Sequence, residues 1–411
     1  MSRSFLLLCL AAGALAQTYP TRFEPAIARG AKVRAALEHI DAHRQEQLAE
    51  WIRITEIAAP SRQEQRRAAY VRAQLEAAGL SGIASDEAGN VWAVRKGSGG
   101  GESVLFAAHM DTVFPADTPV HVRRDVGTLR APGVFDNSAS VANLLAAARA
   151  IERAALRTKG DLIYLFTVQE EIGLRGMRHW LERNRGSVSL VVALDSGLPG
   201  VYYGALGIRW LKFIYTAEGA HTNNSKGKPN PARAVARAIQ NIYTLESPGV
   251  YNVGMIGGGK VFNAISQESY FTVDIRSNDP AVYQDLSERI RRFAEDAAKQ
   301  ERVGFRAEVS SDAPAGGTEQ QLAARRAHPI VQTAVDIQTF LDLGRGRPIR
   351  AVASGSTDAN IGVEMGIPSI AVGRAFGGDQ HTLQEYADID SAYLGAKQII
   401  LLAVSLAQIV E

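Results

Sequence analysis

Blocks of apolar and polar residues along the chain predict a helical N-terminal region followed by alternating strands and helices. From residue 27 to residue 80, apolar side chains recur at helical spacing between charged turns, and Gly79 is placed to end the last of these helices. Beyond it, short apolar runs predict buried strands and amphipathic runs predict helices, an order typical of an α/β sheet with helices on both faces. The predicted strands lie at residues 104–108, 162–168 and 188–194, and the predicted helices at 138–155 and 174–182.

The pattern changes between residues 207 and 316. Strands and helices there follow one another as β-α-β-β-α-β, the order of a ferredoxin-like α+β unit that can close as a small domain of its own. The run Ala-Pro-Ala-Gly-Gly at 313–317 is suited to a return hinge, and the α/β alternation resumes after it. We therefore predict a larger domain divided between residues 17–206 and 317–411, with a lid at 207–316 inserted between its two parts.

Residues 1–16 have the pattern of an export signal. Arg3 precedes an apolar run at 5–16, and Ala14-Leu15-Ala16 has the small-x-small form that signal peptidase cleaves. The run is too short to cross a hydrocarbon layer of roughly 30 Å as a helix, although a buried N-terminal helix would fit the same residues. We expect cleavage near Ala16 and a mature protein that is exported to the periplasm or outside the cell.

Composition narrows the classes of partner. With 46% hydrophobic and 21% charged residues the chain is an ordinary globular one, and its net charge of +2 gives no reason to expect a nucleic-acid partner. No later stretch is apolar for long enough to cross a membrane, so we expect no stable membrane anchor. The single cysteine, Cys9, lies in the predicted signal, which leaves histidines and carboxylates for any metal site.

Candidate metal ligands follow several of the predicted strands. His109 ends one strand, and Asp111 would point the same way in an extended chain, so that its carboxylate can hold the imidazole. Because ligands of α/β sheets bind at the carboxyl ends of strands, side chains that follow different strands would meet there. The other candidates are Asp136 just before a helix, Glu170, Glu171 and Asp195 directly after strands, and His381 in a glycine-rich loop.

Each of these residues also has an ordinary structural interpretation. A single His-x-Asp is often a surface pair, consecutive glutamates are usually solvated, and an isolated aspartate often caps a helix or a turn. Together they indicate a metal site, because several carboxylates at one sheet edge would repel one another without a cation between them.

The motifs AHMDT, GVFDN, QEEIG, ALDSG and GGDQH occur in this order along the chain. They resemble those of the two-zinc metallopeptidase family that includes peptidase T, glutamate carboxypeptidase, aminoacylase and succinyl-diaminopimelate desuccinylase. The resemblance covers essentially the whole mature chain. It implies a zinc-peptidase-like mixed sheet and a lid that also serves for dimerisation, so we expect a homodimer.

The resemblance also implies a ligand set. His109 and Asp195 would bind one zinc, Glu171 and His381 would bind the other, and Asp136 would bridge them. We therefore expect two Zn²⁺ per chain, for which Co²⁺ or Mn²⁺ can substitute.

Two further residues take catalytic roles by the same resemblance. Asp111 would orient His109, and Glu170 would be the general base; the peptide bond after Asp136 would be cis. Two metals that share a water lower its pKa from 15.7 towards ~7, and Glu170 would accept its proton and pass it to the leaving amine. Because adjacent residues of an extended chain point to opposite sides, we expect Glu171 to face the metal and Glu170 the water.

Substrate contacts are implied on the lid and beside the metals. His221, Asn263 and Arg276 match lid positions of the family, the histidine often acting across a dimer, and Gly355 matches its glycine-rich substrate loop. The structural alternatives are a surface histidine, a turn asparagine and an arginine paired to a neighbouring aspartate. In the same loop, Asp358 also fits a helix N-cap.

The expected function is hydrolysis of an amide bond in a small peptide by a secreted exopeptidase, of the peptidase-T-like or the glutamate-carboxypeptidase-like type. The motifs around His109 and Glu170 look closest to the tripeptidase branch. An amidohydrolase that deacylates N-acyl amino acids would use the same site. A metal-binding domain without catalysis is the alternative of another class, and it has no need of an unligated acid such as Glu170.

Overall fold

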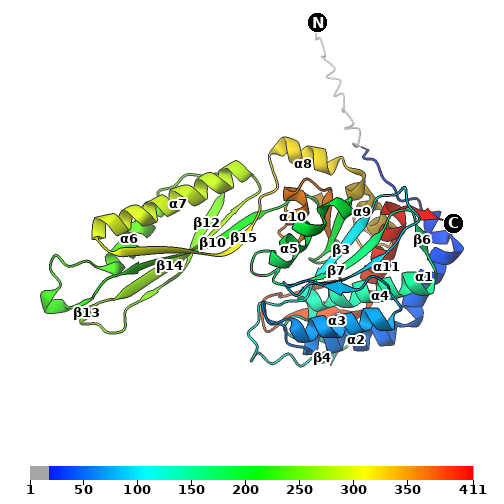
Figure 1. The fold of residues 1–411 in the computed structure, drawn as a ribbon, viewed down its shortest axis with the longest axis horizontal. Coiled ribbons are helices and arrows are strands. Elements are labelled where there is room, and N and C mark those ends of the chain that lie inside the picture. The colour runs from blue at the N-terminus through cyan, green and yellow to red at the C-terminus, as the bar shows by residue number, and fades with distance from the viewer. Residues whose placement is uncertain (1–17, 411) are drawn as a thin grey trace, which may run out of the picture.

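The computed structural model describes residues 18–410, and the predicted signal segment 1–16 lies outside them. This part of the chain forms a larger α/β domain and a smaller unit that extends away from it (Figure 1). The larger domain is built on an eight-stranded sheet in the order β1-β2-β7-β3-β8-β17-β9-β16. Its strands are β1 (Ala84–Ser85), β2 (Val91–Arg95), β3 (Val104–His109), β7 (Leu162–Thr167), β8 (Leu190–Leu194), β9 (Val201–Tyr202), β16 (Ala351–Val352) and β17 (Ser369–Val372).

The sheet is mixed, as predicted. Its four central strands, β7, β3, β8 and β17, are parallel to one another, while β2 and β9 run antiparallel to their neighbours β7 and β17. The carboxyl ends of the four parallel strands therefore lie along one edge. The strand β2 was not predicted from the sequence, because its apolar run is only four residues long, from Val91 to Val94.

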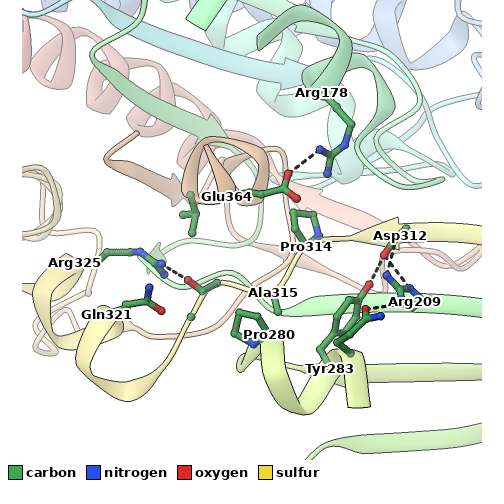
Figure 2. A pocket seen from close by; sticks show the side chains of 14 residues that line it. Arg178, Arg209, Pro280, Tyr283, Asp312, Pro314, Ala315, Gln321, Arg325 and Glu364 are labelled. Atoms are coloured by element: carbon green, nitrogen blue, oxygen red, sulfur yellow. Dashed lines mark hydrogen bonds and ion pairs between the residues drawn. The ribbon is translucent and has the colours of Figure 1, made fainter. Parts of the chain in front are cut away.

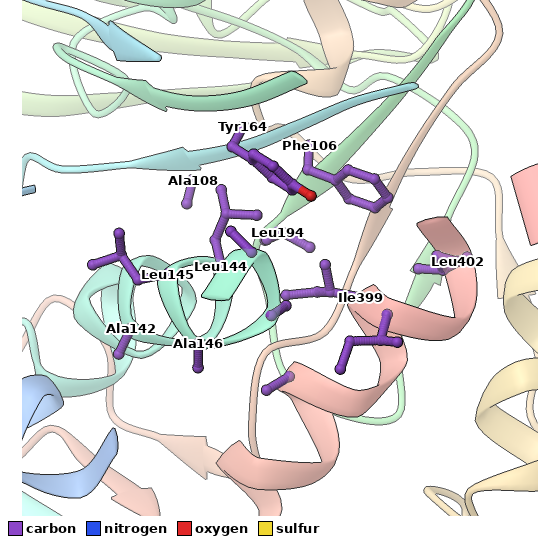
Figure 3. Packing of buried hydrophobic residues seen from close by; sticks show 14 of the residues in the cluster. Phe106, Ala108, Ala142, Leu144, Leu145, Ala146, Tyr164, Leu194, Ile399 and Leu402 are labelled. Carbon is purple, nitrogen blue, oxygen red and sulfur yellow. The ribbon is translucent and has the colours of Figure 1, made fainter. Parts of the chain in front are cut away.

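Alternate residues of the central strands face opposite layers of the core. On β3, Phe106 and Ala108 pack with Tyr164 of β7 in the main core, whereas Leu105 and Ala107 belong to a separate cluster on the other face. Figure 3 shows the first layer, in which these side chains lie against the helices that cover that face. Burial on both faces explains why these strands are continuous apolar runs.

Helices cover both faces of the sheet, as predicted. The main core includes side chains of α1 (Ala31–Ala42), α2 (Arg44–Glu56), α3 (Gln65–Ala77), α4 (Ser140–Arg153), α9 (Pro329–Phe340) and α11 (Ile389–Leu406). The opposite face is covered by α5 (Arg175–Asn184) and α10 (Ala359–Glu364), and α8 (Glu319–Arg326) precedes α9.

One helix corrects the expectation that no later stretch could span a membrane. Among the residues described, α11 has the length and composition of a membrane-spanning helix, but 83% of it is buried inside the protein. It packs against α4, α1 and α9. We therefore assign it to the core of the larger domain.

The smaller unit, called the lid below, has a sheet and a core of its own. Its sheet is antiparallel, in the order β12-β14-β10-β15, and two helices pack on it around Phe213, Phe271 and Leu286. Strands and helices follow the predicted β-α-β-β-α-β order. They are β10 (Gly207–Thr216), α6 (Pro231–Ile242), β12 (Val250–Gly258), β14 (Glu268–Ser277), α7 (Pro280–Glu301) and β15 (Gly304–Ala313), with a small pair β11 (Ala220–His221) and β13 (Ala264–Ile265).

A cavity of about 500 Å³ lies where the lid joins the larger domain (Figure 2). On one side of it Arg178 pairs with Glu364 at 2.7 Å, both from helices of the larger domain. On the other side Arg209 pairs with Asp312 at 3.1 Å, both from lid strands. Each pair lies within one unit, so the lid is a separately packed body joined at the ends of β10 and β15.

Candidate metal centre

Three of the predicted site segments meet at the edge formed by the parallel strands. His109 is the last residue of β3 and pairs in register with Thr167, the last residue of β7, three residues before Glu170. Asp195 directly follows β8, and its backbone N–H donates to the carbonyl of Val372 at the end of β17. The prediction that these side chains gather at the carboxyl ends of the strands is confirmed.

The Asp136 loop enters the same edge from the start of α4. Gly133, at a φ of 75°, turns the chain into a wide helical turn at Val134–Ala139, and the peptide bond between Asp136 and Asn137 is cis, as the resemblance implied. The Asn137 side chain donates to the carbonyl of Leu194 at 3.0 Å. This hydrogen bond holds the loop against the end of β8.

A small sheet brings His381 to the loop. Its order is β18-β19-β5-β4, and β18 and β19 flank the segment that carries His381. The strands β18 (Gly377–Gly378), β19 (Tyr386–Asp388), β5 (Thr128–Arg130) and β4 (Arg123–Asp125) are too short and too polar to be predicted from periodicity.

The side chains form two groups that share Asp136. In the first, Nε2 of His109 lies 3.2 Å from Oδ1 of Asp136 and 3.9 Å from Oδ2 of Asp195. In the second, Nε2 of His381 lies 3.3 Å from Oδ2 of Asp136 and 3.3 Å from Oε2 of Glu171. The two oxygens of Asp136 therefore face different histidines, which is the arrangement that a bridging carboxylate needs.

The residues fit two divalent metal ions. In each group one imidazole nitrogen and two carboxylate oxygens lie within 4.8 Å of one another. Oε1 of Glu171 is a buried atom without a hydrogen-bond partner, which is costly in the absence of a cation. Nitrogen and oxygen ligands suit Zn²⁺, Co²⁺ and Mn²⁺.

Asp111 holds the first histidine and the following turn together. Its Oδ1 lies 3.5 Å from Nδ1 of His109, and its carboxylate accepts hydrogen bonds from the backbone N–H groups of Glu170 at 3.0 Å and Glu171 at 3.2 Å. The hydroxyl of Ser61 donates to it at 2.6 Å. These contacts orient the imidazole so that Nε2 faces Asp136.

Glu170 lies beside both groups with its carboxyl buried. Burial raises its pKa well above the usual range, and the carboxylates of Asp195 and Glu171 raise it further. The expectation that Glu170 and Glu171 point to opposite sides is wrong, because both carboxylates come within 4.8 Å of His109. The chain turns here, with Gln169 at a φ of 56°, rather than continuing as a strand.

Residues 105–337, more than half of the 411-residue chain, match the sequence profile of peptidase family M20/M25/M40. The chain belongs to this family. It is therefore a hydrolase that acts on peptide bonds, and its two groups of histidine and carboxylate side chains form a candidate dinuclear metal centre.

Other proteins are similar to this chain in sequence or in fold. The uncharacterized protein YqjE of Bacillus subtilis is 26% identical over 331 residues, which are 77% of this chain and 85% of that protein. Aminopeptidase PepT from Bacillus cereus has a similar fold, with a TM-score of 0.69 at 19% identity over 89% of this chain and 99% of that chain. So does the YXEP protein of Bacillus subtilis, described as a dinuclear metal binding peptidase of the M20 family, with a TM-score of 0.62 at 18% identity over 89% of this chain and 98% of that chain.

Gly355 lies at the metal centre of this M20 peptidase, and the three lid candidates do not. A cavity of about 260 Å³ is lined by the metal ligands together with Tyr202 and Gly355. His221 pairs with Ala264 in the two-stranded β11–β13 sheet, at the end of the lid farthest from the larger domain (Figure 1). Asn263 directly precedes β13, and its carbonyl accepts from the backbone N–H of Thr222.

Arg276 is held within the lid strand that carries it. Its guanidinium binds the carboxylate of Asp274 through two nitrogens, at 2.9–3.2 Å. This is the pairing that the structural alternative described, and the role of Arg276 toward substrate stays a prediction.

Two charged side chains of the site, Arg374 and Glu385, were not predicted from the sequence. Arg374 is buried against Asp136 and Asp195, and Glu385 accepts hydrogen bonds from the backbone of the Asp136 loop. Asp358 stands at the N-cap position of α10, as expected, but its side chain makes no capping hydrogen bond; its carboxylate accepts from the hydroxyl of Thr167 at 2.5 Å. A charged residue soon after the apolar strand β17 is the signal that would have singled out Arg374.

Proposed function

We propose that this M20 peptidase is an exopeptidase that uses two zinc ions to hydrolyse an amide bond in small peptides. The observation that carries the proposal is Glu170, a buried acid beside both ligand groups whose pKa is raised by burial. A site that only bound metal would have no use for a further buried carboxyl there, which argues against a non-catalytic domain. The small cavity, about 260 Å³, favours a short substrate.

The roles of the side chains follow from their positions. When bound, two divalent metals supply a water that ionises near neutral pH and polarise the scissile carbonyl. Glu170 accepts a proton at its carboxylate and returns it to the leaving amine. Asp111 keeps His109 oriented, and Gly355, at a φ of 127°, packs against Tyr202 in the wall of the cavity.

A panel of di- and tripeptides tests the proposal. One set carries a free α-amino group and an amidated carboxyl end, and the other a blocked amino group and a free carboxylate. Cleavage of either set, abolished by a chelator and restored by Zn²⁺, supports an exopeptidase. Turnover of N-acyl amino acids with no cleavage of peptides would instead identify an amidohydrolase.

We also propose a dimer through the lid. β12 is an edge strand, and Met255, Ile256 and Phe262 are exposed on and beside it. An exposed edge with apolar side chains is a common site of strand pairing between copies. The position of His221 at the far end of the lid supports a role in the partner's site rather than its own.

Export stays a proposal that rests on residues 1–16 alone. The mature protein should begin at Gln17. N-terminal sequencing of native protein checks this, and a chain that begins at Met1 or Ser2 would contradict it.

A further inference from the structure

A buried arginine occupies one side of the metal centre. Arg374 is 2% exposed, its guanidinium contacts Oδ1 of Asp195, and it lies 3.2 Å from Oδ1 of Asp136. The same guanidinium lies over the ring of Phe135, at 4.2 Å from its centroid. Its backbone is fixed as well, because its N–H donates to the carbonyl of Ser196 at 3.1 Å.

These contacts are confined to one of the two ligand groups. Both groups offer the same donors, namely one imidazole, one oxygen of Asp136 and one further carboxylate. The Asp136 oxygen that Arg374 approaches is Oδ1, which faces His109, and not Oδ2, which faces His381. The fixed positive charge therefore stands at the position formed by His109, Asp136 and Asp195, called position one below.

The Arg374 guanidinium also limits which oxygen of Asp195 is free to bind a metal. Its Oδ1 is taken by Arg374 and by the backbone N–H of Ser196, so that Oδ2 is the oxygen left toward His109. A divalent ion at position one would share Asp136 and Asp195 with a unit positive charge in a water-poor site, where charges interact strongly. Among the described residues that form position two, namely Asp136, Glu171 and His381, Asp136 alone contacts Arg374, and it does so through Oδ1, the oxygen that faces His109.

We propose that Arg374 makes the two metal positions unequal, so that position two fills first and position one fills second and more weakly. In the metal-free protein Arg374 offsets part of the negative charge of Asp136 and Asp195, and it stays beside them when the metals bind. It is a positioning residue: it acts through the carboxylates. This inference rests on the two-metal site of the proposed function and not on the substrate.

Single-position variants test the inference by metal binding alone. His381→Ala leaves position one and His109→Ala leaves position two. Titration calorimetry of each metal-free protein with Zn²⁺ should give a weaker affinity, by about tenfold or more, for His381→Ala. If the two variants bound Zn²⁺ with equal affinity, or if His109→Ala bound it more weakly, the proposal would be overturned. These two variants retain Arg374.

Replacement of the arginine then shows whether its charge is the cause. Arg374→Met in the His381→Ala background should raise Zn²⁺ affinity about ten- to a hundredfold, and in the His109→Ala background by less than about threefold. Arg374→Lys, which keeps the charge, should bind as the parent does. Arg149→Met, which removes an arginine paired to Glu50, is the matched control and should change neither.

Equal gains in both backgrounds, or none in either, would overturn the role of Arg374. Because these experiments measure Zn²⁺ binding without substrate, a failure here is distinct from a failure of the peptidase assays.

Discussion

The carboxylate of Glu385 accepts a hydrogen bond of 2.7 Å from the backbone N–H of Asp136, the residue that faces both histidines. It also accepts from the N–H groups of Gly133 at 2.9 Å and Phe135 at 2.8 Å. One side chain, four residues after His381, therefore holds the loop that presents the bridging carboxylate.

Glu385→Ala should weaken both the fold and metal binding. It leaves buried N–H groups unsatisfied, each at a cost of about 1–3 kcal/mol, and frees the Asp136 loop. We expect a lower free energy of unfolding in urea and a weaker Zn²⁺ affinity at both positions. Glu385→Gln keeps one acceptor oxygen, so its free energy of unfolding and its Zn²⁺ affinity should lie between those of the wild type and Glu385→Ala. A stable Glu385→Ala protein with unchanged Zn²⁺ affinity would show that the loop holds itself.

Glu170→Ala should separate metal binding from turnover. Glu170 is not needed to complete either ligand group, so the metal content should stay close to that of the wild type. The loss of a general base should lower kcat by ~10²–10⁴-fold. Asp136→Ala is the contrasting variant and should lose metal and activity together. If Glu170→Ala kept kcat within a few-fold of the wild type, another group would have to be the base.

Removal of the metals should make stability depend on pH. In the metal-free protein burial raises the pKa of Glu171 and Asp358 to about 7, and contacts with Asp136 and Glu171 raise that of His381 to about 10. For the two acids the unfolded chain loses its protons first as pH rises, so stability falls between about pH 4 and 7. For His381 the folded chain keeps its proton longer, so stability falls from about pH 6.5 to 10.

The melting temperature of the metal-free protein should therefore fall steadily from pH 5 to pH 8.5. Zn²⁺ should flatten or reverse this slope, because bound metal keeps the carboxylates ionised and the histidines neutral. Asp358→Asn should reduce the slope in the metal-free protein. Parallel slopes with and without Zn²⁺ would contradict the assignment of these groups to the metal centre.

The metal ligands were predictable because of where they stand in the sequence. His109, Glu171 and Asp195 each end or follow a buried apolar strand, and parallel strands bring their carboxyl ends to one edge. Arg374 and Glu385 were not predicted as site residues, because their roles depend on which loops pack together. The small β18–β19–β5–β4 sheet that brings those loops together has no periodic signal.

The directions of the Glu170 and Glu171 side chains could not be predicted from the sequence either. Side chains alternate between two sides only in an extended chain, and Gln169 ends the extended segment by adopting a left-handed conformation. A glutamine does not indicate a turn at this position. For the lid, the order of strands and helices was predicted from the sequence. The direction in which it extends from the larger domain was not, because the connections at the ends of β10 and β15 determine it.

Mixing two inactive chains should reveal whether the lid histidine serves a partner. His221 lies in the two-stranded β11–β13 sheet at the far end of the lid, whereas Glu170 lies at the candidate metal centre. In a lid-to-lid dimer, a His221→Ala chain paired with a Glu170→Ala chain contains one site with both side chains intact. Mixing should therefore restore part of the activity that each variant lacks alone. Failure to restore activity in a mixture shown to contain mixed dimers, or a monomer by light scattering, would confine His221 to its own chain.

Two roles are open to Arg276: it braces the lid, or it binds the free carboxylate of the substrate. Its two-nitrogen pairing with Asp274 means that a substrate carboxylate would have to displace or share that partner. We therefore expect Arg276 to brace the lid, and Arg276→Lys to change kcat/KM by less than about threefold on every substrate. Amidated peptides with a free amino end should be cleaved well, and peptides with a blocked amino end should be refused.

The opposite outcome is expected if the Arg276 guanidinium binds the free carboxylate of the substrate. Arg276→Lys would then keep the charge but lose the planar guanidinium group. It would lower kcat/KM about ten- to a hundredfold for free-carboxylate peptides alone. Kinetics of the two peptide sets with wild type and Arg276→Lys distinguish these outcomes, because only the clamp makes the loss depend on the carboxyl end of the peptide.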